Sequence, residues 1–407
     1  MNTRIKTISI LLIFLAIISP PFVFSELKFF GKEIRGLIGL TIIILLYLEN
    51  TKFKISEILI LFLLGFIVVI EFLSHRSDLN NVLSAYAVIF VAFSIFRVLK
   101  TNKLSGIIFL HTWMRFSLII SIFAIISFFI NQFIDTSVFF ENSSLFGSSF
   151  NPAYDYKISI FGFTVFKKFS LMGVERVSSF FHEPQYAGMF FAFNFLIASK
   201  NSELFSKKYY TTSVLAGLLT FSVTFYLAYI TYLILSLKVR KIKIIYFCSF
   251  LFLFLLLIFF SLSVNLNISD LQLSQTSFLD RMQRNLYTLE VVKDATFSKV
   301  LFGHGINTYQ DYNLNDESGR GLSSGLLYLL FEFGILISLF ILIMFISFSN
   351  KNYILIAIGT LYLIAIPWYR YYFCWYAIIL CGLDYFNTFN YKNYFTKNNI
   401  KNYKITK

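Results

Sequence analysis

The chain has 407 residues, of which 57% are hydrophobic and 14% charged, and its formal net charge is +14. The apolar residues come in long blocks, which excludes an ordinary soluble core, and no series of alternating ten-residue segments predicts a membrane β-barrel. Lysines and arginines gather at the ends of these blocks and form no basic stripe on a polar domain, so the charge indicates membrane orientation and excludes a nucleic-acid partner.

The first five apolar blocks predict five membrane-spanning helices. A bilayer core about 30 Å thick needs roughly 20 apolar residues per helix, and backbone groups in lipid must pair internally. With the N-terminus in the cytoplasm, the predicted spans cover residues 5–24, 36–48, 55–73, 82–99 and 114–134. The first block follows Arg4 and Lys6, as in a signal peptide. No small-residue cleavage site follows it, so we predict that this span is retained.

The middle of the chain predicts an external loop and a hairpin. Residues 135–179 form the first external (periplasmic) loop, and residues 180–198 cross back. The next block, residues 211–237, has basic residues on both sides, so both of its ends belong in the cytoplasm. A hairpin of two short spans satisfies this pattern, and a single tilted span is the alternative. The tip of the hairpin would lie near Thr220, Ser222 and Thr224.

The last third of the chain predicts a second external loop and a basic tail. A span over residues 244–264 leads into the second external (periplasmic) loop, residues 265–323. Three more spans follow, at residues 326–348, 353–366 and 373–386. The lysine-rich tail 387–407 is then cytoplasmic, and residues 367–372 supply an aromatic belt at the outer interface. The predicted fold is all-α: a single membrane domain, residues 1–407, with about 11 to 12 transmembrane helices.

Several catalytic motifs are missing from the sequence. It has no phosphate-binding glycine loop ending in Lys-Ser or Lys-Thr, no His-Glu-x-x-His and no Asp-x-Asp pair, so it predicts no metal site and no cofactor. Cys248, Cys374 and Cys381 lie inside apolar blocks, where we expect buried thiols. The polar residues concentrate in the two external loops, which points to work at the outer membrane face.

The first candidate site lies directly before the span that follows the first loop. Pro184 suits the first turn of that helix, and Glu183 suits the positive end of its dipole. A structural interpretation makes this segment a helix cap with aromatic anchors. In the functional interpretation Glu183 or His182 is a general base at the membrane surface, and Arg176 contacts an anion.

The second candidate site is a predicted amphipathic helix in the second loop. Apolar residues at positions 278, 282, 286, 289 and 292 follow helical spacing, so this helix would lie on the bilayer. Arg281 and Arg284 share one face of it and could hold a phosphate or diphosphate headgroup. Surface helices also carry such arginines without a specific ligand.

The third candidate site is a tight turn near the end of the second loop. Gly303 and Gly305 demand a tight turn, on which we expect His304 to be exposed. A polar run then leads to Arg320, a further candidate contact for a diphosphate or glycan. Glu332 lies inside the next apolar block, where an ionisable group normally faces an interior cavity.

These patches together resemble the Wzy-type O-antigen polymerase and O-antigen ligase superfamily. The resemblance rests on Arg-x-x-x-Phe-Phe-x-Glu-Pro before a span, the Ser/Thr-rich hairpin tip, Arg281 before Leu-Phe-Gly-His-Gly, and Phe-Glu-Phe-Gly-Ile in the next helix. Two positions depart from the pattern. The hairpin tip has Ser222, Val223 and Thr224 where the family often has Ser-Arg, and residues 323–324 are Ser-Ser where many members have His-Asn.

The resemblance implies a metal-independent glycosyltransferase in the bacterial inner membrane, with both termini cytoplasmic. Such an enzyme takes glycan from an undecaprenyl diphosphate carrier in lipopolysaccharide biosynthesis. Arginines would stabilise the diphosphate leaving group, and Glu183, His182 or His304 would activate the attacking sugar hydroxyl. Membrane lipids, a chain-length regulator and a flippase would be its partners.

Two other functions compete with the polymerase. An O-antigen ligase would move the finished chain to lipid A core, and motif evidence does not separate it from a polymerase; the short, Phe-rich chain favours the polymerase branch. A lipid-linked oligosaccharide flippase or another transporter should carry charges through its spans and keep short loops. In this sequence mid-span charges are few and the loops are long.

Overall fold

Helices make up most of the part of the chain that the structure describes. The computed structural model describes residues 2–20, 22, 32–49, 65, 79–133, 156–159, 164–168, 175–181, 183–236, 288, 291–293, 295–306, 308 and 324–383. Two helical segments, Leu104–Ile130 and Gly325–Phe348, are long and apolar enough to cross a membrane. The mostly helical fold is therefore confirmed, whereas the count of about 11 to 12 spans stays a prediction.

Each predicted span that falls on described residues has a helical counterpart, because long apolar blocks leave the backbone few other ways to pair. The helices are α1 (Asn2–Ile17), α2 (Lys32–Glu49), α4 (Leu79–Thr101), α5 (Lys103–Phe133), α6 (Pro184–Lys200), α7 (Lys207–Leu218), α8 (Val223–Ser236), α11 (Phe297–Phe302), α12 (Gly325–Phe348), α13 (Tyr353–Ala365), the short 3-10 helix η5 (Trp368–Arg370) and α14 (Tyr372–Gly382).

The ends of several helices gather in two groups. At the end that we call the lysine end, the second half of α4 packs on the last turn of α12, where Phe96 and Phe348 stack with ring centroids 4.3 Å apart. Here the Lys200 ammonium at the end of α6 donates to the carbonyl of Cys381 at the end of α14 (2.7 Å). Helices α6 and α14 are therefore parallel, as the predicted alternation of spans requires.

The other end, which we call the Arg370 end, contains the start of α6, the start of α12 and η5. Phe22, just beyond α1, pairs with Phe181, just before α6. Gly325 at the start of α12 approaches the carbonyl of Ile366 after α13, so closely that a Cβ atom would overlap it. Segments far apart in the sequence thus gather at this end.

Helices α7 and α8 form the predicted hairpin. Gly188, in the second turn of α6, lies against Ser222 and Phe225 at the junction of α7 and α8. At the far end of α6, the hydroxyls of Ser199 and Tyr232 are 2.5 Å apart. Helix α8 therefore runs back along α6 toward the lysine end, which confirms the helical hairpin and rules out a single continuous helix over residues 211–237.

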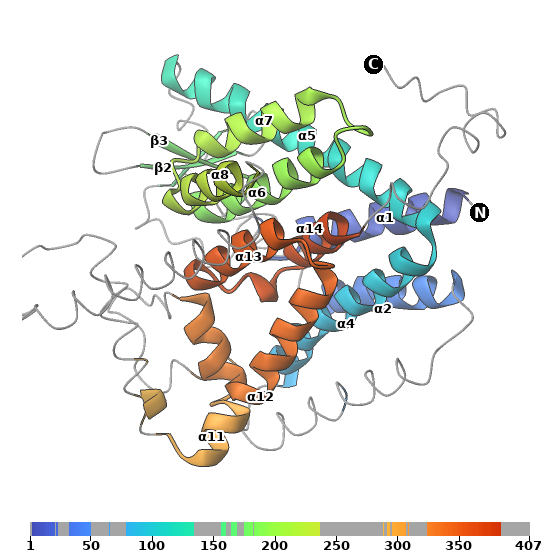
Figure 1. The fold of residues 1–407 in the computed structure, drawn as a ribbon, viewed down its shortest axis with the longest axis vertical. Helices are drawn as coiled ribbons and strands as arrows, with labels where there is room; N and C mark the ends of the chain where they lie inside the picture. Colours follow the sequence, from blue (N-terminus) through green and yellow to red (C-terminus); the bar gives the residue numbers. More distant parts are fainter. Residues whose placement is uncertain are drawn as a thin grey trace, which may run out of the picture.

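Helix α12 is sharply bent, and this corrects the predicted single span over residues 326–348. Gly334 has a positive φ of 64° and a ψ of −173°, which no α-helix contains. The bend returns Ser338 to the side of Leu329, whose carbonyl accepts a hydrogen bond from the Ser338 hydroxyl (3.0 Å). The two arms, residues 325–333 and 335–348, meet at an angle near α11 (Figure 1).

The segment predicted as the first external loop contains a small sheet, so the all-α prediction needs an addition. Strands β1 (Tyr156–Ser159), β2 (Thr164–Lys168) and β3 (Glu175–Ser179) form an antiparallel sheet in the order β1-β2-β3. Each strand has only four or five residues. These strands lie at the lower limit of about four residues at which alternating polarity can be read, and no strand was predicted in this loop.

The aromatic residues between α13 and α14 are buried in the bundle, so the predicted interfacial belt is wrong for Trp368 and Tyr369. Their indole and phenol rings are 1% and 2% exposed. The Trp368 indole donates to the Gly359 carbonyl, and the Trp375 indole donates to the Tyr369 carbonyl, both at 2.8 Å. These contacts fix η5 between α13 and α14.

Several predictions fall outside the described residues: the spans over 55–73 and 244–264, most of the second external loop, Cys248 and the tail. The buried thiols predicted at Cys374 and Cys381 are confirmed.

Candidate functional site

A buried ion pair lies at the Arg370 end. Glu332, at the end of the first arm of α12, is fully buried, and its carboxylate pairs with the guanidinium of Arg370 in η5. The same guanidinium lies over the ring of Tyr328, 5.0 Å from the ring centroid. The Arg370 side chain is 22% exposed, although its Nε and Nη2 atoms are themselves buried. The expected interior position of Glu332 is thus confirmed.

The turn at residues 303–305 holds the backbone around Glu332. A bend in a helix leaves carbonyl groups without their helical partners, and buried carbonyls need other donors. The backbone N–H of His304 donates to the Phe331 carbonyl (2.7 Å), and that of Gly305 donates to the Glu332 carbonyl (3.2 Å). The Leu-Phe-Gly-His-Gly patch is therefore the cap of the broken helix.

Two glycines make this close approach feasible. Gly303 has a φ of 88°, and a Cβ atom there would overlap the carbonyl group of Glu332. Gly334 has a φ of 64°, and a Cβ atom there would overlap the Leu301 carbonyl and the Gly303 nitrogen. Positive φ and backbone contact both favour glycine, so the two patches Leu-Phe-Gly-His-Gly and Phe-Glu-Phe-Gly form one backbone unit.

His304 is buried, and the predicted exposed position is wrong. Its side chain is 5% exposed and stacks on Phe331, with ring centroids 4.4 Å apart and an interplanar angle of 2°. Its Nδ1 atom lies 3.3 Å from the Phe331 carbonyl oxygen. The tight turn packs on α12 because the N–H groups of His304 and Gly305 donate to carbonyls of the bent helix. The His304 side chain is therefore part of the cap and is covered by protein.

The start of α6 has the predicted form. Pro184 occupies the first turn, and Glu183 is the N-cap residue with extended backbone angles. The Glu183 side chain makes no capping hydrogen bond and is half-buried. Its carboxylate therefore lies at the positive end of the helix dipole without serving as the cap. His182 lies outside the described residues.

Two tyrosines connect Glu183 with Arg370. The hydroxyl of Tyr371, beside Arg370, donates to the hydroxyl of Tyr186 in the first turn of α6 (3.1 Å). Burial raises the pKa of the Tyr371 phenol to about 12, against the lowering effects of the Tyr186 hydrogen bond and the Arg370 charge; Glu183 adds a smaller raising effect. Both charged groups thus act on the same phenol, which stays protonated near neutral pH.

Arg370 keeps its charge in this setting. Burial lowers the pKa of the guanidinium, but the carboxylate of Glu332 and the nearby Tyr369 outweigh burial and raise the pKa well above its ordinary value. A charged guanidinium therefore lies beside Tyr371, on which Glu183 also acts.

Arg176 lies at the tip of the α7–α8 hairpin. Its Nε donates to the carbonyl of Thr220 (3.2 Å), and the backbone N–H of Val177 donates to the carbonyl of Leu219 (3.3 Å). Strand β3 therefore covers the break between α7 and α8 and leads directly into α6. The two patches predicted around Arg176 and the hairpin tip are in contact.

The other predicted arginines, Arg281, Arg284 and Arg320, lie outside the described residues. The last turn of the predicted amphipathic helix is described in part: Val291 and Val292 pack against Tyr328 and Phe331. That turn thus lies on the first arm of α12.

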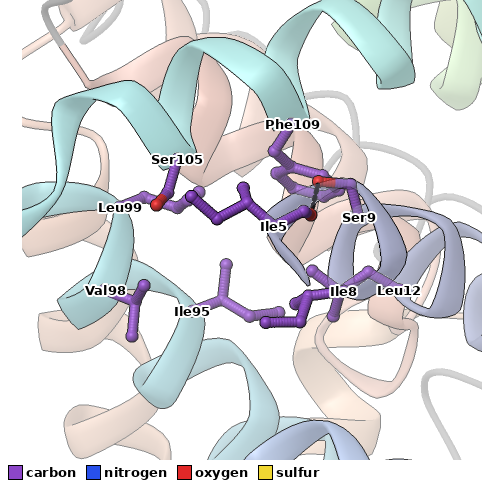
Figure 2. Close-up of a pocket in the computed structure, with 9 residues that line it drawn as sticks. All are labelled: Ile5, Ile8, Ser9, Leu12, Ile95, Val98, Leu99, Ser105 and Phe109. Atoms are coloured by element: carbon purple, nitrogen blue, oxygen red, sulfur yellow. Dashed lines mark hydrogen bonds between the residues drawn. The ribbon is translucent and has the colours of Figure 1, made fainter. Parts of the chain in front are cut away.

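A small cavity lies at the opposite end of the molecule, between α1, α4 and α5 (Figure 2). It holds about 20 Å³, which is room for roughly one water molecule. Its lining is apolar apart from two serines: Ile5, Ile8, Ser9, Leu12, Ile95, Val98, Leu99, Ser105 and Phe109. The cavity is too small and too apolar for a substrate. Among the described residues, no three His, Cys, Asp or Glu side chains gather into a metal site.

Arg370 is the residue that the sequence analysis missed, because it was grouped with interfacial aromatics. A signal was present. Arg370 is a cation on the predicted outer side, where positive charges are disfavoured, and Glu332 in an apolar block required a partner.

The site therefore joins groups from α6, α12, η5 and the 303–305 turn. Comparisons with known protein families, with curated proteins and with solved structures find no match to this chain.

Proposed function

We propose that this chain spans a bacterial inner membrane as a multi-pass protein, with the lysine end and both termini in the cytoplasm. The charged pair Glu332–Arg370 lies inside the molecule, whereas large apolar side chains are exposed on its outer helices, which is the reverse of a soluble protein. Exposed examples are Leu37, Leu40 and Ile44 on α2, Ile119, Ile126 and Phe129 on α5, and Leu339, Ile343 and Ile346 on α12.

The lysines favour this orientation. Lys100, Lys200, Lys207 and Lys351 lie in or beside the helix ends that meet at the lysine end. Such an excess of positive charge marks the cytoplasmic side of membrane proteins. The Arg370 end then faces the periplasm, together with the sheet and the 303–305 turn.

We infer that the Arg370 end is the active site of an O-antigen polymerase, a glycosyltransferase that joins undecaprenyl-diphosphate-linked oligosaccharide repeats. One observation carries this proposal: four patches far apart in the sequence form a continuous series of contacts. The hairpin tip touches Arg176, β3 leads into Glu183, Tyr186 bonds Tyr371, and Arg370 pairs with Glu332, whose carbonyl binds the glycine turn.

The chemistry of these groups suits transfer from a lipid diphosphate. A sugar hydroxyl of one repeat forms a bond to the anomeric carbon of another, and the bond from that carbon to the diphosphate oxygen breaks. Glu183 takes the hydroxyl proton, and the guanidinium of Arg370 stabilises the negative charge that develops on the departing diphosphate. Tyr371 is next to Arg370 in the chain, and its phenol donates a hydrogen bond to Tyr186 in the first turn of the helix that Glu183 caps.

A transporter for a lipid-linked oligosaccharide is the second candidate, and the bend of α12 favours it. Broken helices and buried charge pairs are common at the binding sites of transporters. A flippase would carry the repeat across the membrane without forming a glycosidic bond, so the two functions predict different products.

The test is a gel of surface polysaccharide from a deletion strain of the native bacterium. Wild type, Glu183→Gln and Arg370→Gln are expressed at matched membrane levels, with Glu203→Gln at the lysine end as control. We expect lipid A core with a single repeat in the deletion strain and both site variants, and a full ladder with wild type and the control. Core without any repeat would favour a ligase or flippase. A full ladder in the deletion strain would reject the polymerase.

A further inference from the structure

The Glu332–Arg370 pair is unequal in its exposure. The carboxylate is completely buried, whereas the arginine side chain reaches the surface. The arginine side chain is therefore the part of the pair that can be reached from outside, although its Nε and Nη2 atoms are buried with the carboxylate. An apolar pair of similar volume would serve stability about as well, since desolvation offsets most of the attraction between buried charges. Stability alone gives little reason for this pair.

Two backbone hydrogen bonds and the bend of α12 hold the segment that carries Glu332. Its carbonyl accepts the Gly305 N–H, the preceding carbonyl of Phe331 accepts the His304 N–H, and the bend at Gly334 ends the helix two residues later. The backbone that carries the Glu332 carboxylate is therefore held in place. A carboxylate in a fixed position can hold the Arg370 guanidinium in one orientation.

Arg370 is held by further contacts besides Glu332. Its guanidinium lies over Tyr328, on the same arm of α12 as Glu332, and the rest of η5 is anchored by the indoles of Trp368 and Trp375. Arginine has a planar group with donors in a fixed arrangement, so its orientation decides which oxygen atoms it can contact.

We propose that Glu332 is a positioning residue that, on the backbone unit formed by Gly303, Gly305 and Gly334, orients Arg370 toward the diphosphate of the lipid-linked substrate. This inference rests on the proposed function for its substrate. Glu332 itself touches no reacting atom. The second external segment contributes to the site through the 303–305 turn, which holds Glu332 and thereby Arg370.

Substitutions of Arg370 and Glu332 should therefore affect KM and kcat differently. Arg370→Gln removes the cation, so KM for the lipid-linked repeat rises and kcat falls by roughly a hundredfold. Glu332→Gln keeps the cation and removes the neutralising charge, so the diphosphate is still attracted and KM does not rise. The guanidinium is no longer oriented, so kcat still falls by more than tenfold.

A charge exchange distinguishes positioning from a structural role. The double variant Glu332→Arg with Arg370→Glu restores an ion pair but places the cation on the buried side. We expect it to recover most of the thermal stability lost in the single variants, while turnover stays at least tenfold below wild type. A purely structural pair would recover both.

The assay uses purified full-length protein in lipid nanodiscs and the lipid-linked repeat extracted from the deletion strain. A second readout is the rise in melting temperature with undecaprenyl diphosphate, compared with uncharged undecaprenol. Wild type should respond only to the diphosphate, and Arg370→Gln should lose this response. Lys200→Gln, which removes a cation at the lysine end, should keep it.

The outcomes test the two proposals separately. Wild-type turnover in the exchanged double variant, or a wild-type kcat in Glu332→Gln, would overturn the positioning role while the polymerase stands. Absence of any glycan product with wild-type protein would reject the polymerase. The response to undecaprenyl diphosphate would then still decide whether Arg370 binds the headgroup, and equal responses in wild type and Arg370→Gln would reject that contact.

Discussion

The two ends of the molecule use partly buried cationic side chains in different ways. At the lysine end, the Lys200 ammonium donates to the carbonyls of Cys381, Gly382 and Leu383, at 2.7, 3.1 and 3.2 Å. It thereby neutralises the negative end of the α14 dipole. At the Arg370 end, the cation pairs with a carboxylate and remains partly exposed.

We therefore interpret Lys200 as a structural cation and Arg370 as a candidate functional one. Backbone carbonyls at a helix end always need donors, so Lys200 satisfies a requirement of the fold itself. Glu332 is a side chain that the fold does not require, and its presence creates the need for Arg370. Four substitutions test this difference between the two ends.

Loss of Arg370 should have the largest effect. Arg370→Ala leaves Glu332 charged and buried without its partner, which should destabilise the protein by about 3 to 5 kcal/mol. The melting temperature in detergent, measured by loss of folded monomer on size-exclusion chromatography, checks this. Glu332→Gln in the same background should restore part of the stability, since it removes the buried charge. No recovery would show that the ion pair is not the source of the loss.

The glycine unit should come next. Gly303→Ala forces a Cβ atom against the Glu332 carbonyl at a φ of 88° and should cost about 1 to 3 kcal/mol in backbone strain, with further loss from the overlap. A melting curve of the variant measures it. Gly36→Ala on α2 is the control, because a Cβ atom there meets nothing within 4 Å. Equal melting temperatures of the two variants would contradict the close backbone contact.

Loss of Lys200 should have a smaller effect on stability and none on the site. Lys200→Met leaves the carbonyls at the end of α14 without their charged donor, for which we expect a cost of about 1 to 2 kcal/mol. Thermal unfolding measures the cost, and the polysaccharide ladder should keep its wild-type length in cells with matched protein levels. A ladder reduced to a single repeat would remove the distinction between the two ends.

Glu183→Gln should change stability least and activity most selectively. The side chain makes no capping bond, so the neutral isostere should alter unfolding by less than about 0.5 kcal/mol. Polymer synthesis should fall by about a hundredfold or more if the carboxylate is the general base. Initial rates on the extracted lipid-linked repeat measure this, with Glu203→Gln as the matched control. A wild-type rate would remove Glu183 from the mechanism.

The sequence predicted much of the fold, because long apolar blocks follow simple rules. Such blocks favour helices, and the basic residues on both sides of residues 211–237 favoured a turn within that block, so the helices and the α7–α8 hairpin could be predicted. Helix boundaries such as Pro184 at the start of α6 were also readable, since local chemistry decides them.

The site was predicted in pieces. Glu183, Arg176 and the glycine turn were singled out, but the exposed position assigned to His304 was wrong, and Arg370 was taken for part of an aromatic belt. Composition gives no sign that residues 303–305 supply N–H groups to a bent helix 27 residues later in the chain.

Hydrophobic length and charge distribution are properties of each segment alone, so the sequence was sufficient to predict a mostly helical chain. The bend of α12 at Gly334, its cap by the glycine turn and the pairing of Glu332 with Arg370 are visible only in the folded chain. Each of these facts depends on a contact between segments distant in sequence, and no periodicity within one segment encodes its partner.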